Sequence, residues 1–275
     1  MALDAKKLRK PFRNLRKSLK RFPERPTPEQ VHDLRTNSRK LEAVIQALAF
    51  DGQPRGRRLL KTVAPVRKNA GKVRDMDVLT ALTSTLALKG EEECLVQLLE
   101  HLTAKRARSV KKLLRIIEKQ RSQARTLLQY YSSAIEKCFG APQHDAPQVH
   151  QWPALATSTA LQLSRELANW PYLRRDNLHP YRLRIKQLRY VLQLRDDPDD
   201  EFVGALGDAK DAIGEWHDWS ELEGIAAGLL NHRLVVGKRH LARSAELAPH
   251  HGHRIFRLAS SRRCLAVVRG PDRER

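Results

Sequence analysis

The sequence predicts an all-α protein. Leu, Ala, Lys, Arg, Glu and Gln dominate the composition, glycine accounts for only 13 of 275 residues, and runs of β-branched residues are rare. Apolar residues recur at the three- and four-residue spacing of amphipathic helices. Two segments far apart in the chain also carry the same residue pattern, which predicts an internal repeat and two similar helical halves.

The first helix is expected at residues 5–21. Its apolar residues at helical spacing are Leu8, Phe12, Leu15 and Leu19, and lysines and arginines occupy most other positions. Three interpretations of these bases remain open. They could form one wall of an anion-binding groove, lie on a membrane surface, or be the solvated face of an ordinary bundle helix.

The second helix is expected to begin just after Thr27. This threonine can cap the helix, Pro28 suits the first helical position, and Gln30 completes a capping box. The helix should run to about Phe50, where the sequence Asp-Gly-Gln-Pro at 51–54 stops it.

Three further helices are expected in the first half, at residues 57–72, 76–88 and 91–139. Pro65 either kinks the first of them or starts a new helix, because a proline inside a helix removes a hydrogen bond. In the long third segment we expect a break near residues 103–105.

A linker with three prolines, at residues 140–153, separates the two halves. Helices are expected in the second half at 152–170, from the turn that contains Pro180, and at 202–231, since proline is tolerated in a first helical turn. The predicted organisation is a first bundle at 1–140, a linker at 141–153, a second bundle at 154–248 and a basic tail at 249–275.

The formal net charge of +21 is the strongest global feature of the chain. Such an excess of positive charge implies a polyanionic partner, which could be nucleic acid, an anionic membrane surface or polyphosphate. No apolar run is long enough to span a membrane, and the amino-terminal residues lack a secretory signal. Cys94, Cys138 and Cys264 lie far apart, as expected for reduced thiols in a cytoplasmic protein.

Each half contains a basic stretch that opens with a histidine and is expected to be helical. The first copy carries His32, Arg35 and Arg39; the second carries His179, Arg182 and Lys186, with Arg189 one turn further. On a helix these offsets fall on one face. The apolar residues expected on the opposite faces are Leu34, Leu41, Ile45 and Leu48 in the first copy and Tyr181, Ile185, Leu188 and Leu192 in the second.

A second repeated motif follows each basic helix. It reads Gly-Lys-Val-Arg-Asp from Gly71 and Gly-Glu-Trp-His-Asp from Gly214. Aligned on the glycines, Arg74 matches His217, and the two aspartates, Asp75 and Asp218, match each other. We expect the aspartates to orient neighbouring arginine or histidine side chains rather than to act as bases.

The two copies also differ. Pro180 places His179 at the amino end of its helix, where backbone N–H groups favour anions, whereas His32 lies inside its helix. Glu42 stands where the second copy has Arg189, which should weaken the first basic row and make any groove that the two rows border asymmetric.

The order and duplication of these motifs resemble the CHAD domain, the conserved-histidine α-helical domain, over roughly residues 1–235. The Leu-Arg-Tyr sequence at 188–190 is typical of its second half. The resemblance implies two four-helix bundles related by pseudo-twofold symmetry, with a basic groove that binds inorganic polyphosphate. The binding residues predicted on this basis are His32, Arg35, Arg39, Lys40, Arg67, Arg74, His179, Arg182, Lys186, Arg189, Lys210 and His217.

Nucleic-acid binding is the main alternative, because any basic surface attracts phosphate polymers. The basic rows lack the interleaved aromatic residues on which bases stack, which favours a phosphate polymer without bases. A metal-dependent phosphohydrolase is a less favoured alternative. The chain has the His-Asp doublets His32-Asp33, His144-Asp145 and His217-Asp218, and a weak metal site at His250, His251 and His253 is conceivable, but bases near His32 and His217 would repel a divalent cation.

We therefore expect a non-catalytic protein that needs no cofactor, binds inorganic polyphosphate and is associated with polyphosphate granules in the cytoplasm. The sequence does not predict its oligomeric state.

Overall fold

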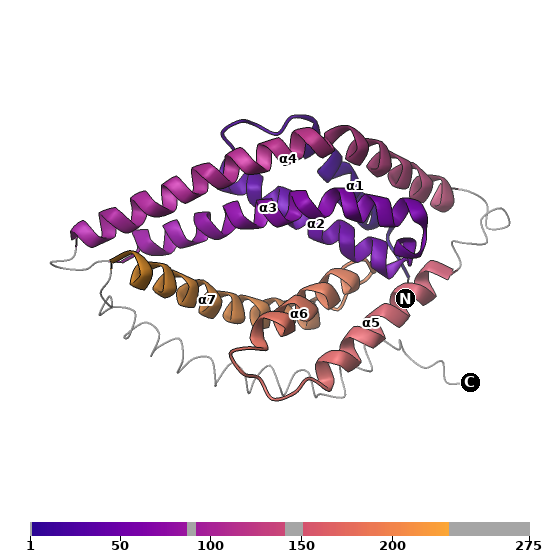
Figure 1. Ribbon diagram of the computed structural model, residues 1–275. Helices are drawn as coiled ribbons and strands as arrows, with labels where there is room; N and C mark the ends of the chain where they lie inside the picture. The colour runs from indigo at the N-terminus through magenta and orange to yellow at the C-terminus, as the bar shows by residue number, and fades with distance from the viewer. Residues whose placement is uncertain (1, 87–91, 141–150, 231–275) are drawn as a thin grey trace.

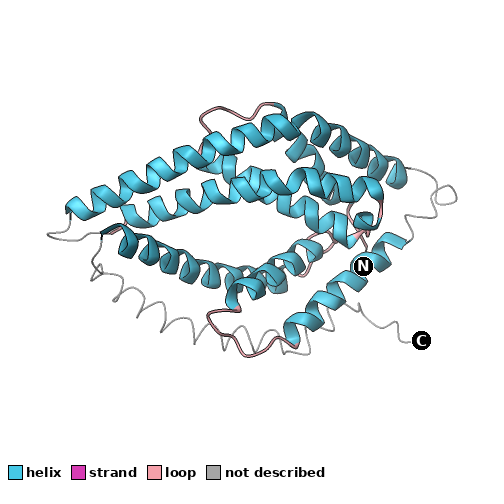
Figure 2. Cartoon of the chain, in the orientation of Figure 1, coloured by secondary structure: helices cyan, strands magenta, loops and turns pink. Residues whose placement is uncertain are grey.

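The computed structural model describes residues 2–86, 92–140 and 151–230. Over these residues the chain forms seven α-helices and one short 3-10 helix, and no strand longer than the isolated bridge between Leu3 and Arg195 (Figures 1 and 2). The prediction of an all-α fold is therefore confirmed. None of the helices in the described ranges combines the length and the apolar character that a bilayer-spanning segment requires.

The helices form two layers that face each other (Figure 1). The first half of the chain supplies α1 (Ala5–Lys20), α2 (Pro28–Ala47), the 3-10 helix η1 (Phe50–Gly52), α3 (Pro54–Ser84) and α4 (Glu92–Gly140). The second half supplies α5 (Gln151–Ala168), α6 (Leu178–Leu192) and α7 (Asp200–Leu230). Residues 231–248 of the predicted second bundle, and the tail with its histidines, lie outside the described residues.

Local sequence signals set the starts of the first two helices. The predicted capping box is present, because the Thr27 backbone N–H donates to Oε1 of Gln30 (2.9 Å) and the Gln30 N–H donates to Oγ1 of Thr27 (3.3 Å). Asp4 caps α1 by accepting from the backbone N–H groups of Lys6 and Lys7. The helix α2 ends at Ala47, before the predicted Phe50, and Ala49 adopts a left-handed conformation with φ 53°.

Two predicted helix breaks are wrong. A single helix, α3, joins the two segments predicted at 57–72 and 76–88, continues through Pro65 and ends at Ser84, before the predicted residue 88. Its buried stripe, which includes Val63, Val66, Ala70 and Val73, is uninterrupted, so the packing holds the helix together across the proline.

The helix α5 begins at Gln151, so the last three residues of the predicted linker are helical, and residues 141–150 lie outside the described part.

The long helix α4 also runs without a break through residues 103–105. Leu98 and Leu102 before that point and Leu113 after it are fully buried. Just beyond it, Arg106 pairs with the buried carboxylate of Asp77 on α3 and donates from Nη2 to the carbonyl oxygen of Pro26 (2.9 Å). Packing contacts therefore hold the helix on both sides of residues 103–105, and α4 continues through them without a break.

Apolar contacts join the two halves at both ends. At one end, the Trp152 ring of α5 packs on Phe50 (centroids 5.5 Å apart) and on Phe139 of α4 (5.9 Å). At the other end, a smaller core brings together α3, α4 and α7, and its buried members are Met76, Leu79, Leu98, Leu102, Leu222 and Ala226. The space between the layers is thus bounded by a hydrophobic junction on each side.

The smaller core makes a testable contribution to stability. Leu222 is 3% exposed, whereas Leu229, two turns later on the same helix, is 36% exposed. We expect Leu222→Ala to lower the free energy of unfolding by about 2–5 kcal/mol, and Leu229→Ala to change it by less than about 0.5 kcal/mol. Guanidinium unfolding followed by circular dichroism measures both, and equal effects would show that the junction contributes little.

Candidate anion-binding site

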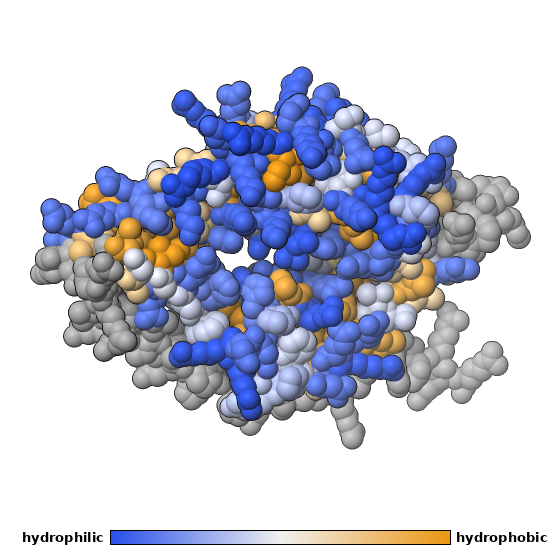
Figure 3. Space-filling model, in the orientation of Figure 1, coloured by the Kyte–Doolittle hydropathy of each residue, from blue (hydrophilic) through white to orange (hydrophobic). Residues whose placement is uncertain are grey.

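The predicted basic residues come from four helices that face one another across the two layers. Helices α2 and α3 belong to the first half, and α6 and α7 to the second (Figure 1). The space-filling view shows an opening between the layers with hydrophilic residues around it (Figure 3). All the residues predicted on the apolar faces of the two basic helices are buried, which leaves the basic rows on the opposite faces.

In each half, an arginine of the basic helix packs against the glycine of the repeated motif that follows it. A methyl group placed on Gly214 of α7 would lie 2.8 Å from Cζ of Arg182, and one placed on Gly71 of α3 would lie 3.5 Å from Nε of Arg35. The missing side chain of Gly214 therefore makes room for Arg182, whereas at Gly71 a methyl group would make an ordinary contact with Arg35. In both halves the arginine is the one three residues after the histidine of the preceding basic helix. The two motifs of each half form one unit, with an arginine lying over a glycine.

The histidines show the same correspondence. The rings of His179 and His217 lie with their centroids 5.3 Å apart. Burial lowers the pKa of His32 and the nearby charge of Arg74 lowers it further, just as burial and His217 lower the pKa of His179. The internal alignment of Arg74 with His217 thus matches the histidine on which each of them acts.

Lys186 lies at the centre of the site. It is half-buried, and burial together with the charges of Arg182, Arg35, Lys210 and Arg39 lowers its pKa to about 7. These neighbours come from α2, α6 and α7, so both halves of the chain contribute to the same electrostatic cluster. Like-charged groups gathered in this way favour any anion that can enter.

Two arginines of the second row are fixed by backbone carbonyls. Arg182 donates from Nε to the carbonyl oxygen of Lys210 (3.1 Å), and Arg189 donates from Nε to that of Val203 (3.2 Å). In both cases the helix α7 holds the arginine through Nε. The terminal NH₂ groups of these arginines are then available for other acceptors.

The first row is arranged differently because of Glu42. This carboxylate lies 3.3 Å from Nε of Arg67 and 3.7 Å from Nη1 of Arg39. It compensates part of the charge of the first row, as expected, and it also holds two predicted binding residues from α2 and α3 next to each other. The asymmetry between Glu42 and Arg189 makes the second row the more strongly positive one.

The remaining predicted residues lie at the edges of this cluster. Burial lowers the pKa of Lys40, and Lys10 and Arg189 lower it further, which places Lys40 between α1 and α6. Lys210 forms an ion pair with Asp211 and contributes to the lowered pKa of His32. The structure therefore brings all twelve predicted residues into one connected region, in which Lys10 of α1 also takes part.

Sequence reasoning missed Tyr190. Burial raises the pKa of its hydroxyl, against the opposing charges of Arg35, Arg189, Arg39 and Arg182. The residue follows Lys186 by four positions, so it continues the basic face of α6 by one turn. An extension of the same helical spacing would have found it.

The aspartates of the repeated motif lie beside the arginines and histidines, as expected. Oδ1 of Asp218 lies 3.7 Å from Nδ1 of His217, and this carboxylate raises the pKa of the histidine against the effect of burial. Burial raises the pKa of Asp75, while Arg35 lowers it. Within the described ranges, no three His, Cys, Asp or Glu side chains gather closely enough to hold a metal ion.

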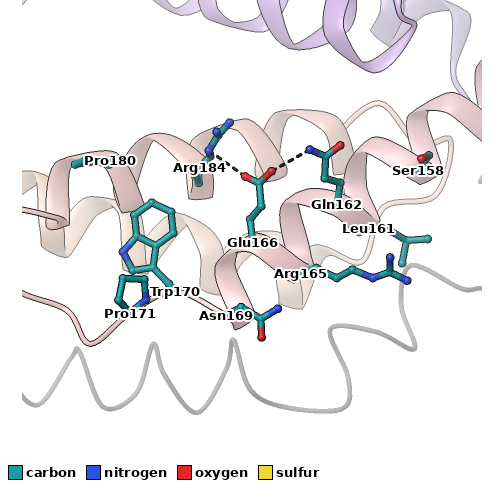
Figure 4. Close-up of a pocket in the computed structure, with 10 residues that line it drawn as sticks. All are labelled: Ser158, Leu161, Gln162, Arg165, Glu166, Asn169, Trp170, Pro171, Pro180 and Arg184. Atoms are coloured by element: carbon teal, nitrogen blue, oxygen red, sulfur yellow. Dashed lines mark hydrogen bonds and ion pairs between the residues drawn. The ribbon is translucent and has the colours of Figure 1, made fainter.

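A separate pocket lies between α5 and α6 (Figure 4). Here Glu166 accepts from Nε2 of Gln162 (3.0 Å) and pairs with Nε of Arg184 (3.1 Å). The positive charge of Arg184 is therefore compensated locally. With Arg165 as the other charged residue of its lining, this pocket has far fewer cations than the space around Lys186.

Comparison with known proteins gives the same assignment as the repeated motifs. The family model of the CHAD domain matches residues 6–227, which is most of the chain. The chain belongs to the CHAD family. A search of curated proteins found no match.

Two solved structures resemble the CHAD fold seen here. The CHAD domain from the plant Ricinus communis shares 17% identity with a TM-score of 0.60, and the alignment covers 94% of each chain. PptA from Streptomyces chartreusis shares 19% identity with a TM-score of 0.52, and the alignment covers 93% of this chain and 96% of that one. At these identities the resemblance establishes the fold.

The packing of arginine on glycine predicts a difference between two glycines of α7. Gly204 has open space around its Cα, so Gly204→Ala should raise the free energy of unfolding by about 0.5–1 kcal/mol through helix propensity. In Gly214→Ala the new methyl group displaces the Arg182 guanidinium from the carbonyl of Lys210, which should cancel that gain. Chemical unfolding compares the two variants, and equal stabilisation would contradict the packing described.

Proposed function

We propose that this CHAD domain binds inorganic polyphosphate, without catalysing a reaction, in the groove between its two helical layers. The observation that carries the proposal is the cluster around Lys186, in which cationic side chains from both halves gather. A linear polyphosphate carries negative charge along its whole length, and this charge is complementary to the cationic side chains that four helices contribute.

In this proposal the arginines bind phosphate oxygens and the lysines act as point charges. Arg182 and Arg189 are already anchored through Nε, so their terminal NH₂ groups bind the ligand without losing much conformational freedom. Lys186 binds as the ammonium ion, and the histidines His32 and His179 add hydrogen bonds that strengthen when their rings are protonated.

The same geometry disfavours nucleic acid as the preferred ligand. Proteins that bind single strands without sequence preference use aromatic platforms for the bases. Among the described residues, the exposed large aromatic side chains are Tyr130 on α4 and Tyr172 before α6, and Tyr130 already stacks with Arg55. Neither belongs to the cluster around Lys186. We further propose that the protein acts in the cytoplasm at polyphosphate granules.

Charge reversal tests the groove directly. We expect Arg182→Glu combined with Lys186→Glu to weaken polyphosphate binding at least about 100-fold, because two charge-assisted contacts are lost and replaced by repulsion. Binding is measured by titration of labelled long-chain polyphosphate, with helix content checked by circular dichroism.

A matched control separates the groove from the overall charge. Lys111 and Lys112 are exposed on α4, and reversing both to Glu changes the formal net charge by the same amount. We expect this control to weaken binding less than about tenfold. Equal losses in the two double variants would mean that the total charge, and not the groove, determines affinity. The pair Arg182→Gln with Lys186→Gln provides a milder test if the first variant loses helix content.

Binding should also depend on pH in a defined direction. The pKa of Lys186 is about 7 in the free protein, and a bound phosphate chain raises it by favouring the ammonium ion. Affinity is therefore highest below pH about 7 and falls as the pH rises above it, because binding must then take up a proton. Protonation of His32 and His179 extends the increase toward lower pH, since their pKa values are lowered in the free protein.

Lys186→Arg is the control for this effect, since arginine stays charged throughout. This variant should retain binding and lose most of the dependence on pH above neutrality. A wild-type affinity that stays constant from pH 6 to 9 would contradict the role given to Lys186.

A further inference from the structure

Lys186 occupies an unusual position for a lysine amine. It is half-buried on α6, with Arg182 one turn earlier on the same helix, Arg35 and Arg39 from α2, and Lys210 from α7. These four cations are the neighbours with the largest effects on its charge, while the carboxylates Asp75 of α3 and Asp211 and Asp218 of α7 act on the neighbouring Arg182. Arg184, two residues earlier on the same helix, is different, because it pairs with the Glu166 carboxylate at 3.1 Å.

This position gives the amine two properties that favour reaction with anions. Lys186 is half-buried, and Arg182, held against the backbone of Lys210 (3.1 Å), lies one turn earlier on the same helix. Burial among like charges disfavours the ammonium ion and lowers the pKa of Lys186 to about 7, so its amine is neutral and nucleophilic far more often near neutral pH than that of an exposed lysine. The surrounding cations also raise the local concentration of small anions. An electrophile that carries negative charge therefore meets an unprotonated nucleophile here.

We propose that Lys186 is a covalent modification site, at which the amine is acylated by small acyl phosphates. The Nζ lone pair of Lys186 attacks the carbonyl carbon of the acyl phosphate, an amide bond forms, and the bond from that carbon to the phosphate oxygen breaks. Inorganic phosphate leaves with the electron pair, and the amine proton passes to solvent or to the departing phosphate. The positive groups Arg182 and Lys210 stabilise the phosphate both before and after the transfer.

Acylation would remove a positive charge from the centre of the groove and fill part of its space. It should therefore lower the affinity for polyphosphate, as the loss of a lysine charge does at other anion sites. This consequence rests on the proposed function, while the modification itself rests only on the cluster of cations. The two can fail separately.

The test uses the full chain and acetyl phosphate. Acetylation at each lysine is followed over time by mass spectrometry of peptides produced by a protease that does not cut at lysine. Exposed Lys111 and Lys112 serve as internal references. We expect the initial rate at Lys186 near pH 7 to exceed theirs by roughly tenfold or more, and to level off above pH about 7 while the reference rates keep rising.

An uncharged acetylating reagent separates recruitment from reactivity. With such a reagent the preference for Lys186 should shrink, because the cationic neighbours no longer attract the electrophile. If Lys186 reacts with acetyl phosphate no faster than the exposed lysines, or if its rate follows theirs across the pH range, the proposed modification site is wrong.

Added polyphosphate distinguishes this proposal from the proposed function. Protection of Lys186, with the exposed lysines unaffected, supports both. Selective acetylation that polyphosphate does not slow would overturn polyphosphate binding in the groove and would leave the modification site standing. Binding of polyphosphate to a protein whose Lys186 is unreactive would overturn the modification site alone.

Discussion

The site requires several positively charged side chains to stay close together despite their mutual repulsion, and the packing of the two layers serves this requirement. Lys186, Arg182, Arg35 and Arg39 act on one another in a half-buried space, and the lowered pKa of Lys186 reports the resulting electrostatic strain. Apolar junctions at both ends of the opening, around Trp152 and around Leu222, hold the two layers in place. An anion bound in the groove relieves the repulsion, so binding should stabilise the folded chain.

Duplication of one structural unit explains how the CHAD fold builds such a site. In each half an arginine of the basic helix lies over a glycine of the helix that follows, and the same two helices bring a histidine beside a second basic residue. The two units face each other, which doubles the positive charge without requiring a long basic run in the sequence. The first copy has Glu42 at the position where the second has Arg189, so the second side of the site carries more positive charge.

Much of this arrangement could be predicted from residue spacing, because it depends on local helical geometry. The capping box at Thr27 and the buried faces of the two basic helices follow from the sequence alone. The continuity of α3 through Pro65 and of α4 past residue 105 could not, because packing and the partners of Arg106 override local signals. The same helical spacing could have predicted the place of Tyr190. It could not have predicted the lowered pKa of Lys186, because that pKa depends on residues of three helices.

The central claim is that the groove is shaped for a bare phosphate chain, and a competition assay tests it most directly. Labelled long-chain polyphosphate is bound to the full chain at near-physiological salt and challenged with single-stranded RNA, duplex DNA and heparin at equal concentrations of phosphate or sulfate. We expect unlabelled polyphosphate alone to displace the label efficiently. Equal displacement by RNA or DNA would contradict the account, because it would mean that positive charge by itself determines what this protein binds.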